Sequence, residues 1–143
     1  MDRFEDLFGR VCYKVLVFNQ NEKPHAGYQD MIAFYTDKGV SWLTHNQDCC
    51  ENVYIADVCG DFKDIENSLI LHAEESSHGA EEHEVCESGT WTFYKLATVK
   101  GWVDIRWLGE SNGYYSESVD FMHTTTEDFE STVLPSYLRP VNY

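Results

Sequence analysis

Residues 90–108 read TWTFYKLATVKGWVDIRWL, and this stretch decides the fold. Aromatic and β-branched side chains, which β-strands favour, fill both of its halves. Gly101 stands between the halves as a turn residue, so the pattern predicts two strands, at 90–100 and 102–108. A chain built around such a hairpin forms an antiparallel sheet.

Further strands are predicted wherever apolar and β-branched residues alternate or run together between turn signals. They are expected at residues 10–19, 31–36, 40–45, 53–59, 69–72 and 115–122. The sequence therefore predicts a mainly β (α+β) fold, an antiparallel sheet or sandwich of about seven to eight short strands with one or two short helices.

The two short helices are expected beside these strands. The first covers residues 2–8, with Asp2 as its N-cap and Glu5 completing a capping box. The second covers residues 60–66 and begins at Asp61, a residue type that accepts hydrogen bonds from the first helical N–H groups.

The last strand, 115–122, is expected to pair with the strand before it as a hairpin. The apolar faces match when Trp107 lies opposite Val119, which also places Arg106 across from Asp120. This register predicts a three- or five-residue turn with a glycine bulge.

A length of 143 residues fits one domain. We expect a single antiparallel β-rich domain over residues 1–123 and an extended arm or partly disordered tail over residues 124–143. Two polar stretches, 20–29 and 74–87, are expected to be loops, and the second is expected to be exposed and mobile.

The acidic residues are concentrated in one part of the chain. The chain has 25 Asp and Glu against 10 Lys and Arg, a net charge of −15. Residues 48–87 hold 12 of these acids and one base, Lys63, a net of −11, which leaves −4 for the rest. Direct nucleic-acid binding through a basic surface is therefore disfavoured, and a basic protein partner is favoured. The alternative is an acidic face that only keeps the protein in solution.

The predicted partner-binding residues are exposed acids of this segment together with two aromatic residues beside a turn. They are Asp48, Glu51, Asp57, Asp61, Asp64, Glu74, Glu75, Glu81, Glu82, Glu84, Tyr114 and Tyr115. Aromatic residues in loops are often exposed and contact partners. Phe93 and Trp107, inside predicted strands, are expected to fill the core.

The compact cluster of metal-ligand types is His45, Asp48, Cys49 and Cys50. Zinc sites usually take cysteines separated by two to four residues, whereas adjacent cysteines point to opposite sides of an extended chain. We therefore expect no metal and no cofactor, with one of these cysteines buried and the other near the surface. A small-ligand or metal-binding domain that uses these four residues remains the alternative.

The sequence shows no signature of a known catalytic site. A thiol nucleophile with His45 or His72 as its base has no supporting motif, so we expect a protein without enzymatic activity. The N-terminus lacks a basic segment followed by an apolar one, and no apolar run reaches the length of a membrane span. We expect a cytoplasmic protein that keeps its five cysteines reduced and does not bind membranes.

Three motifs carry a family resemblance. HNQDCCE at 45–51, WTFYK at 91–95 and GESNGYYSE at 109–117 resemble a domain of unknown function that is common in tailed bacteriophages and prophages. The resemblance runs from about Phe8 to Phe121 and implies a phage origin and an intracellular site of action, but no activity. Small acidic phage proteins often occupy host proteins, including defence nucleases and transcription machinery.

The first functional hypothesis is an inhibitor that acts by protein–protein interaction. Its acidic region would block a basic, nucleic-acid-binding host protein, in a counter-defence role or as a DNA mimic. The second hypothesis is the small-ligand or metal-binding domain, and the third is a minor component of the virion.

Overall fold

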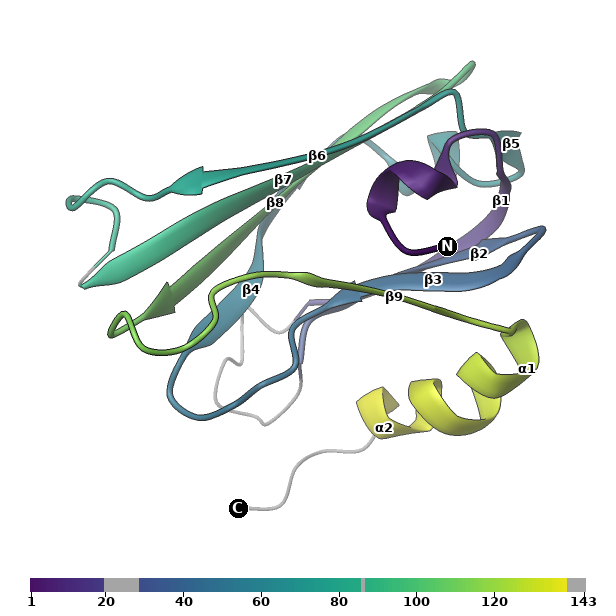
Figure 1. The fold of residues 1–143 in the computed structure, drawn as a ribbon. Helices are drawn as coiled ribbons and strands as arrows, with labels where there is room; N and C mark the ends of the chain where they lie inside the picture. The colour runs from purple at the N-terminus through teal and green to yellow at the C-terminus, as the bar shows by residue number, and fades with distance from the viewer. Residues whose placement is uncertain (20–28, 86, 139–143) are drawn as a thin grey trace.

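The computed structural model describes residues 1–19, 29–85 and 87–138. Among these residues, nine strands form two antiparallel sheets that face each other as a sandwich (Figure 1). The predicted mainly β fold is therefore confirmed. The loop expected at 20–29 lies outside the described residues except for its last residue.

The first sheet has five strands in the spatial order β5-β1-β2-β3-β9. Their bounds are β1 Val11–Phe18, β2 Met31–Thr36, β3 Gly39–Thr44, β5 Ser68–Leu69 and β9 Asp120–Thr124. The predicted strands 10–19, 31–36 and 40–45 are confirmed, with small shifts at their ends.

The second sheet has four strands in the order β4-β8-β7-β6. Their bounds are β4 Asn52–Cys59, β6 His72–Gly79, β7 Ser88–Thr98 and β8 Gly101–Ser111. β7 and β8 form the predicted hairpin, in which Tyr94 lies opposite Ile105. Both side chains are fully buried, so this hairpin supplies one wall of the core.

Side chains from both sheets and from the 3-10 helix η1 (Phe4–Leu7) fill the space between the sheets. Phe4 is fully buried, and its ring centroid lies 4.6 Å from that of Tyr94. Each large apolar side chain buried in this way stabilises the fold by roughly 1.5–3 kcal/mol. Other fully buried members are Phe34, Leu43, Ile55, Ile65, Ile105 and Trp107.

η1 begins later than expected and is capped differently. Its N-cap is Arg3, and the carboxylate of Asp6 accepts hydrogen bonds from the N–H groups of Asp2 and Arg3, at 2.9 and 3.0 Å. The carboxylate of Glu5 instead accepts a hydrogen bond from the N–H of Glu75 on β6. The predicted capping by Asp2 and Glu5 is wrong, because Asp6 is the residue that reaches back to the start of the helix.

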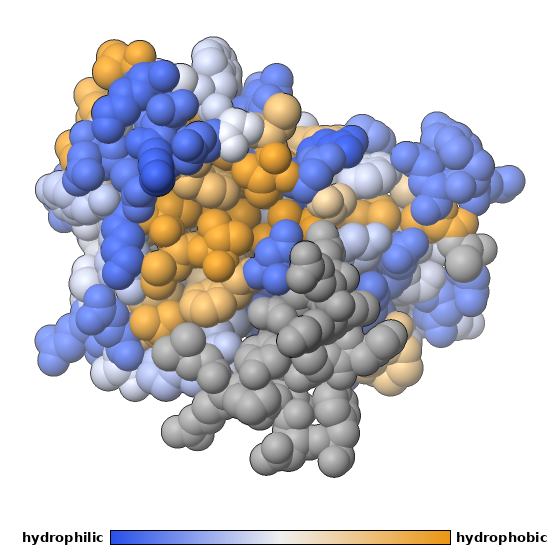
Figure 2. Space-filling view, turned by 180° about the vertical axis from the view of Figure 1, so that it is seen from behind, coloured by the Kyte–Doolittle hydropathy of each residue, from blue (hydrophilic) through white to orange (hydrophobic). Residues whose placement is uncertain are grey.

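The second short helix is confirmed as η2 (Phe62–Asp64), and Asp61 caps it by accepting a hydrogen bond from the N–H of Lys63 at 2.9 Å. Phe62 is partly buried against the core together with Val15 of β1 and Val58 of β4. Figure 2 shows the face opposite to that in Figure 1, and apolar side chains reach the surface there.

The segment after β9 is helical, so the predicted extended arm is wrong. It consists of α1 (Thr126–Asp128), a π-helical turn η3 (Phe129–Val133) and α2 (Leu134–Leu138). This segment covers the outer face of the five-stranded sheet, where Phe129 is fully buried at 5.2 Å from the ring of Trp42. Apolar residues four apart on one helix face produce this contact, a pattern that the preceding threonine run obscured.

The last strand joins the other sheet, so the predicted hairpin with β8 is wrong. β9 pairs with β3, and both sides of β8 are occupied by β4 and β7. Arg106 lies opposite Asp57 of β4 and not opposite Asp120. The apolar match between Trp107 and Val119 was real but not specific, since both residues face the same core.

The expectation of one strand at 69–72 followed by a loop at 74–87 is also wrong. The chain forms the short β5 and then β6, which pairs with β7 and ends at Gly79. β6 lies at the edge of its sheet and is largely exposed, so it lacks the apolar alternation by which strands are recognised.

Candidate functional site

The loop after β3 holds a buried pair formed by His45 and Glu51. The Nε2 of His45 lies 2.8 Å from the Oε2 of Glu51, and its Nδ1 lies 2.8 Å from the carbonyl oxygen of Ser118. Each residue of the pair is only 4% exposed. Each ring nitrogen therefore lies within hydrogen-bond distance of an oxygen atom.

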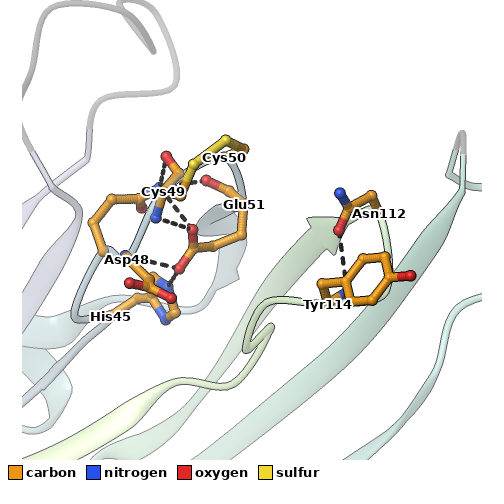
Figure 3. The surroundings of a disulfide bond; sticks show 8 residues. His45, Asp48, Cys49, Cys50, Glu51, Asn112 and Tyr114 are labelled. Carbon is orange, nitrogen blue, oxygen red and sulfur yellow. Dashed lines mark hydrogen bonds and ion pairs between the residues drawn. A yellow bond between two sulfur atoms is a disulfide. The ribbon is translucent and has the colours of Figure 1, made fainter.

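The carboxylate of Glu51 organises the rest of this loop (Figure 3). It accepts hydrogen bonds from the N–H of Cys49 at 2.8 Å, from the N–H of Asp48 at 3.0 Å and from the side-chain amide of Gln47 at 3.2 Å. Burial raises the pKa of Glu51, but the hydrogen bonds from Cys49, His45 and Asp48 outweigh it and lower the pKa to about 2. The loop is therefore folded around an ionised glutamate.

Cys49 and Cys50 form a disulfide between adjacent residues, and both are exposed. The expectations that these thiols are reduced and that one of them is buried are wrong. Cys12 and Cys59 are free, the first buried and the second exposed. The turn at Asp48 and Cys49 that wraps the Glu51 carboxylate keeps the two neighbouring sulfurs on one side of the loop.

The proposed ligand set of His45, Asp48, Cys49 and Cys50 does not converge on one point. His45 is turned inward to Glu51, and the two sulfurs are bonded to each other. Across residues 1–19, 29–85 and 87–138, no three His, Cys, Asp or Glu side chains are arranged to hold a metal ion.

A second loop, between β8 and β9, is held by Glu117. Its carboxylate accepts hydrogen bonds from the hydroxyls of Thr90, at 2.8 Å, and Ser111. Burial raises the pKa of Glu117, but these hydrogen bonds outweigh it, so the pKa is lowered. A side chain at Gly109 would collide with the backbone of Glu117, so the crossing of the loop over β8 requires glycine there.

The two loops meet at one end of the sandwich. The ring of His45 contacts the backbone of Ser118, and the N–H of Asn46 donates to the carboxylate of Asp120 at 3.0 Å. Tyr114 stands out from the second loop and is 89% exposed, because the Asn112 side chain accepts a hydrogen bond from its N–H and fixes the turn. Tyr115 is partly buried.

The predicted acidic residues lie mainly along the two edges of the four-stranded sheet. Asp48, Glu51 and Asp57 belong to β4 and the loop before it, and Asp61 and Asp64 lie around η2. The remaining five lie on β6 and the turn that follows it, Glu74, Glu75, Glu81, Glu82 and Glu84. Charged residues at a sheet edge oppose pairing with the wrong chain. This protective role explains part of the acidity without any binding partner.

Several of these acids are already engaged inside the protein. Glu51 is buried, and Asp57 forms a two-bond pair with the guanidinium of Arg106, one of these bonds at 2.8 Å. Glu75 accepts a hydrogen bond from the buried Tyr94 hydroxyl at 2.7 Å, and Glu84 accepts one from the N–H of Glu81 at 2.9 Å.

Residues 72–85, called the acidic edge below, carry the acids that are best placed for a partner. This segment has five glutamates and no Lys or Arg. Glu74, Glu81 and Glu82 are exposed. Sequence reasoning found these acids but could not separate them from Glu51 and Asp57.

The outer face of the four-stranded sheet carries an aromatic group that sequence reasoning missed. The rings of Trp91 and Phe93 stack with centroids 6.2 Å apart, and the Arg106 guanidinium lies 5.2 Å from the Trp91 ring. Phe93 is therefore not a core residue, whereas Trp107 is fully buried as predicted. Counting alternately from the buried Tyr94 would have placed Phe93 on the outer face.

Comparison with known proteins identifies one family. The model described as "Domain of unknown function (DUF7448)" matches residues 5–121. No curated protein and no solved structure matches the chain. Within the described residues, no helix is long and apolar enough to cross a membrane.

Proposed function

Because the chain belongs to the DUF7448 family, whose function is unknown, we propose from its geometry that it is a binding module for a cationic partner protein. The acidic edge carries this proposal. Its five glutamates stand on an edge strand and the following turn with no Lys or Arg among them, and Glu74, Glu81 and Glu82 are exposed.

The electrostatics of the acidic edge favour capture of basic surfaces. Each exposed carboxylate contributes little alone, but an array of one sign raises the local concentration of cationic partners and speeds their docking. Glu74 lies opposite Lys95 of β7 in the strand pairing, and its carboxylate is 3.9 Å from the Nε2 of His72, so Glu81 and Glu82 are the freer charges.

The exposed Tyr114 lies in the loop between β8 and β9 and supplies an aromatic anchor. This loop and the turn after β6 lie at the same end of the sandwich (Figure 1). Tyrosine in such a position often dominates the binding energy of an interface, while surrounding charges direct the approach. Tyr114 therefore supplies affinity, and the acidic edge supplies salt-dependent attraction.

Within this function, we propose a nucleic-acid-binding protein of a bacterial host as the partner. The net charge of −15 supports a basic target. Action in the cytosol of a phage host is part of this proposal and rests on the resemblance of the 45–51, 91–95 and 109–117 motifs to a phage domain family. In this proposal the chain blocks nucleic-acid access to a defence or transcription protein, including by mimicry of nucleic acid.

The test is affinity capture from bacterial lysate by the immobilised chain, at low and high salt and with DNA as competitor. A nucleic-acid-binding protein that is captured by the wild type, released by salt and displaced by DNA is the expected result. The double variant Glu81→Gln/Glu82→Gln should lose most of this capture.

The matched control is Glu127→Gln/Glu130→Gln, which removes the same charge from the helical segment on the other sheet. Equal capture by the wild type and both variants would overturn the assignment to the acidic edge, and capture that is insensitive to salt would overturn the electrostatic mechanism.

A further inference from the structure

β6 is the last strand of its sheet, and its outer backbone edge is only partly covered. The 3-10 helix η1 packs against the first half of β6, whereas the second half runs beyond η1 (Figure 1). An edge of this kind can take up a further strand from another chain.

The hydrogen bonds show which backbone groups of β6 point outward. The N–H of Glu75 donates to the Glu5 carboxylate of η1 at 2.9 Å, so the backbone N–H of Glu75 points away from β7. The N–H of Ala80 donates inward to the carbonyl of Gly89 at 2.9 Å. The backbone N–H groups of a strand point alternately to its two sides, so those of Ser77 and Gly79 point outward like that of Glu75.

The structure protects one outward position and leaves the next ones open. The Glu5 carboxylate accepts the hydrogen bond from the N–H of Glu75. No hydrogen bond from the N–H of Ser77 or Gly79 occurs within the described part of the chain. Both residues are small and exposed, and a Cβ at Gly79 would meet no atom within 4 Å.

We propose that β6 pairs at Ser77 and Gly79 with an extended, lysine- or arginine-containing segment of the partner protein, which adds a strand to the four-stranded sheet. This inference rests on the proposed function and specifies how the acidic edge binds. Backbone hydrogen bonds to β6 provide the pairing, and the glutamates on either side, Glu74, Glu81 and Glu82, select the charge of the segment.

The charge also argues against a second copy of this chain as the occupant. Pairing of two β6 strands would bring two acidic edges together, each with five glutamates and no Lys or Arg. Like charges across a sheet edge oppose association, whereas a basic segment is attracted.

The experiment uses the full chain and two short synthetic peptides with blocked ends. The first alternates lysine and valine, and the second has the same sequence with every backbone amide N-methylated, so it keeps the charge but loses the N–H donors. The first peptide should slow hydrogen exchange at the amides of Ser77 and Gly79 and bind roughly tenfold or more tightly than the second.

Variants of β6 separate the backbone from the charge. Ser77→Pro removes an outward N–H, and an edge strand tolerates proline at such a position. This variant should bind the first peptide only as tightly as the wild type binds the second. Ser77→Ala keeps the N–H and should bind as the wild type does. If Ser77→Pro fails to fold, the comparison of the two peptides on the wild type is sufficient.

Equal affinity for the two peptides, or unchanged exchange at Ser77 and Gly79, would overturn strand addition. If the wild type forms dimers in solution and Ser77→Pro is monomeric, β6 pairs with a second copy of this chain and the proposed pairing with a basic segment is overturned. The proposed function is tested separately by Glu81→Gln/Glu82→Gln. If that variant weakens both peptides while Ser77→Pro has no effect, the acidic edge binds cations without adding a strand.

Discussion

The Oε2 of Glu51 lies 2.8 Å from the Nε2 of His45 in a site where both residues are buried. This pair ties the last residue of the 45–51 loop to its first, and the other nitrogen of the same ring ties that loop to Ser118. One imidazole therefore joins the two loops at this end of the sandwich, and its partner Glu51 holds the disulfide-bearing turn.

Replacement of Glu51 by glutamine should destabilise the fold. The variant replaces the buried carboxylate that accepts hydrogen bonds from the N–H groups of Asp48 and Cys49 and faces the His45 ring, and loss of such hydrogen bonds to a buried charged group costs about 1–3 kcal/mol. Denaturant unfolding monitored by fluorescence measures the loss. Asp48→Asn, an exposed change in the same loop, should alter the free energy of unfolding by no more than about 0.5 kcal/mol. Equal stability of Glu51→Gln and the wild type would show that the pair is not structural.

The Glu51 contribution should depend on pH. The pKa of Glu51 falls from 4.5 to about 2 on folding, so its ionised form stabilises the folded state. That stabilisation is fully present above the unfolded value and is lost as the pH falls through the folded value. The difference in free energy of unfolding between wild type and Glu51→Gln should therefore shrink between about pH 5 and about pH 2. A difference that stays constant over this interval would contradict the assignment.

Gly109→Ala should disrupt the loop between β8 and β9. The added Cβ meets the backbone of Glu117, which cannot move aside as a flexible side chain could, and overpacking of this kind costs about 1–3 kcal/mol. Gly79→Ala is the control, since a Cβ there meets no atom within 4 Å. Thermal unfolding of the two variants should differ, and identical midpoints would contradict the close approach.

Phe129→Ala should release the helical segment from the outer face of the five-stranded sheet. Phe129 is fully buried against Tyr35 and Trp42, and truncation of a buried phenylalanine costs about 3–5 kcal/mol. Hydrogen exchange should accelerate in α1, η3 and α2. Tyr114→Ala, which removes a side chain that is 89% exposed, should leave stability unchanged. Slow exchange in the Phe129→Ala helix would show that other contacts hold it.

The sequence predicted the parts of the fold that depend on neighbouring residues. The β7–β8 hairpin follows from its aromatic strands and Gly101, and the strands β1 to β4 follow from local alternation or from short apolar runs. The strand predicted at 115–122 overlaps β9 (Asp120–Thr124) only at 120–122, because residues 115–119 lie in the loop before it. Its predicted partner is wrong because the choice between β8 and β3 depends on which edges are still free once the rest has folded.

The candidate site was predictable in composition but not in arrangement. The acids of 48–87 can be counted in the sequence, yet Glu51 looks the same as Glu81 there. Their different roles come from burial and from hydrogen-bond donors that a turn supplies, the N–H groups of Asp48 and Cys49. The outward edge of β6 was hidden for a related reason, since an exposed edge strand has no apolar face to reveal it.

The helical segment after β9 has a consequence for how the protein behaves in a crowded solution. It lies beyond the family match, which ends at residue 121, yet it covers an outer sheet face built from Met31, Ala33, Tyr35, Val40 and Trp42. If the segment detaches or is cut away, that face becomes adhesive and invites aggregation. Proteolysis just after β9 would therefore make this acidic protein prone to aggregation, although the core between the sheets would stay intact.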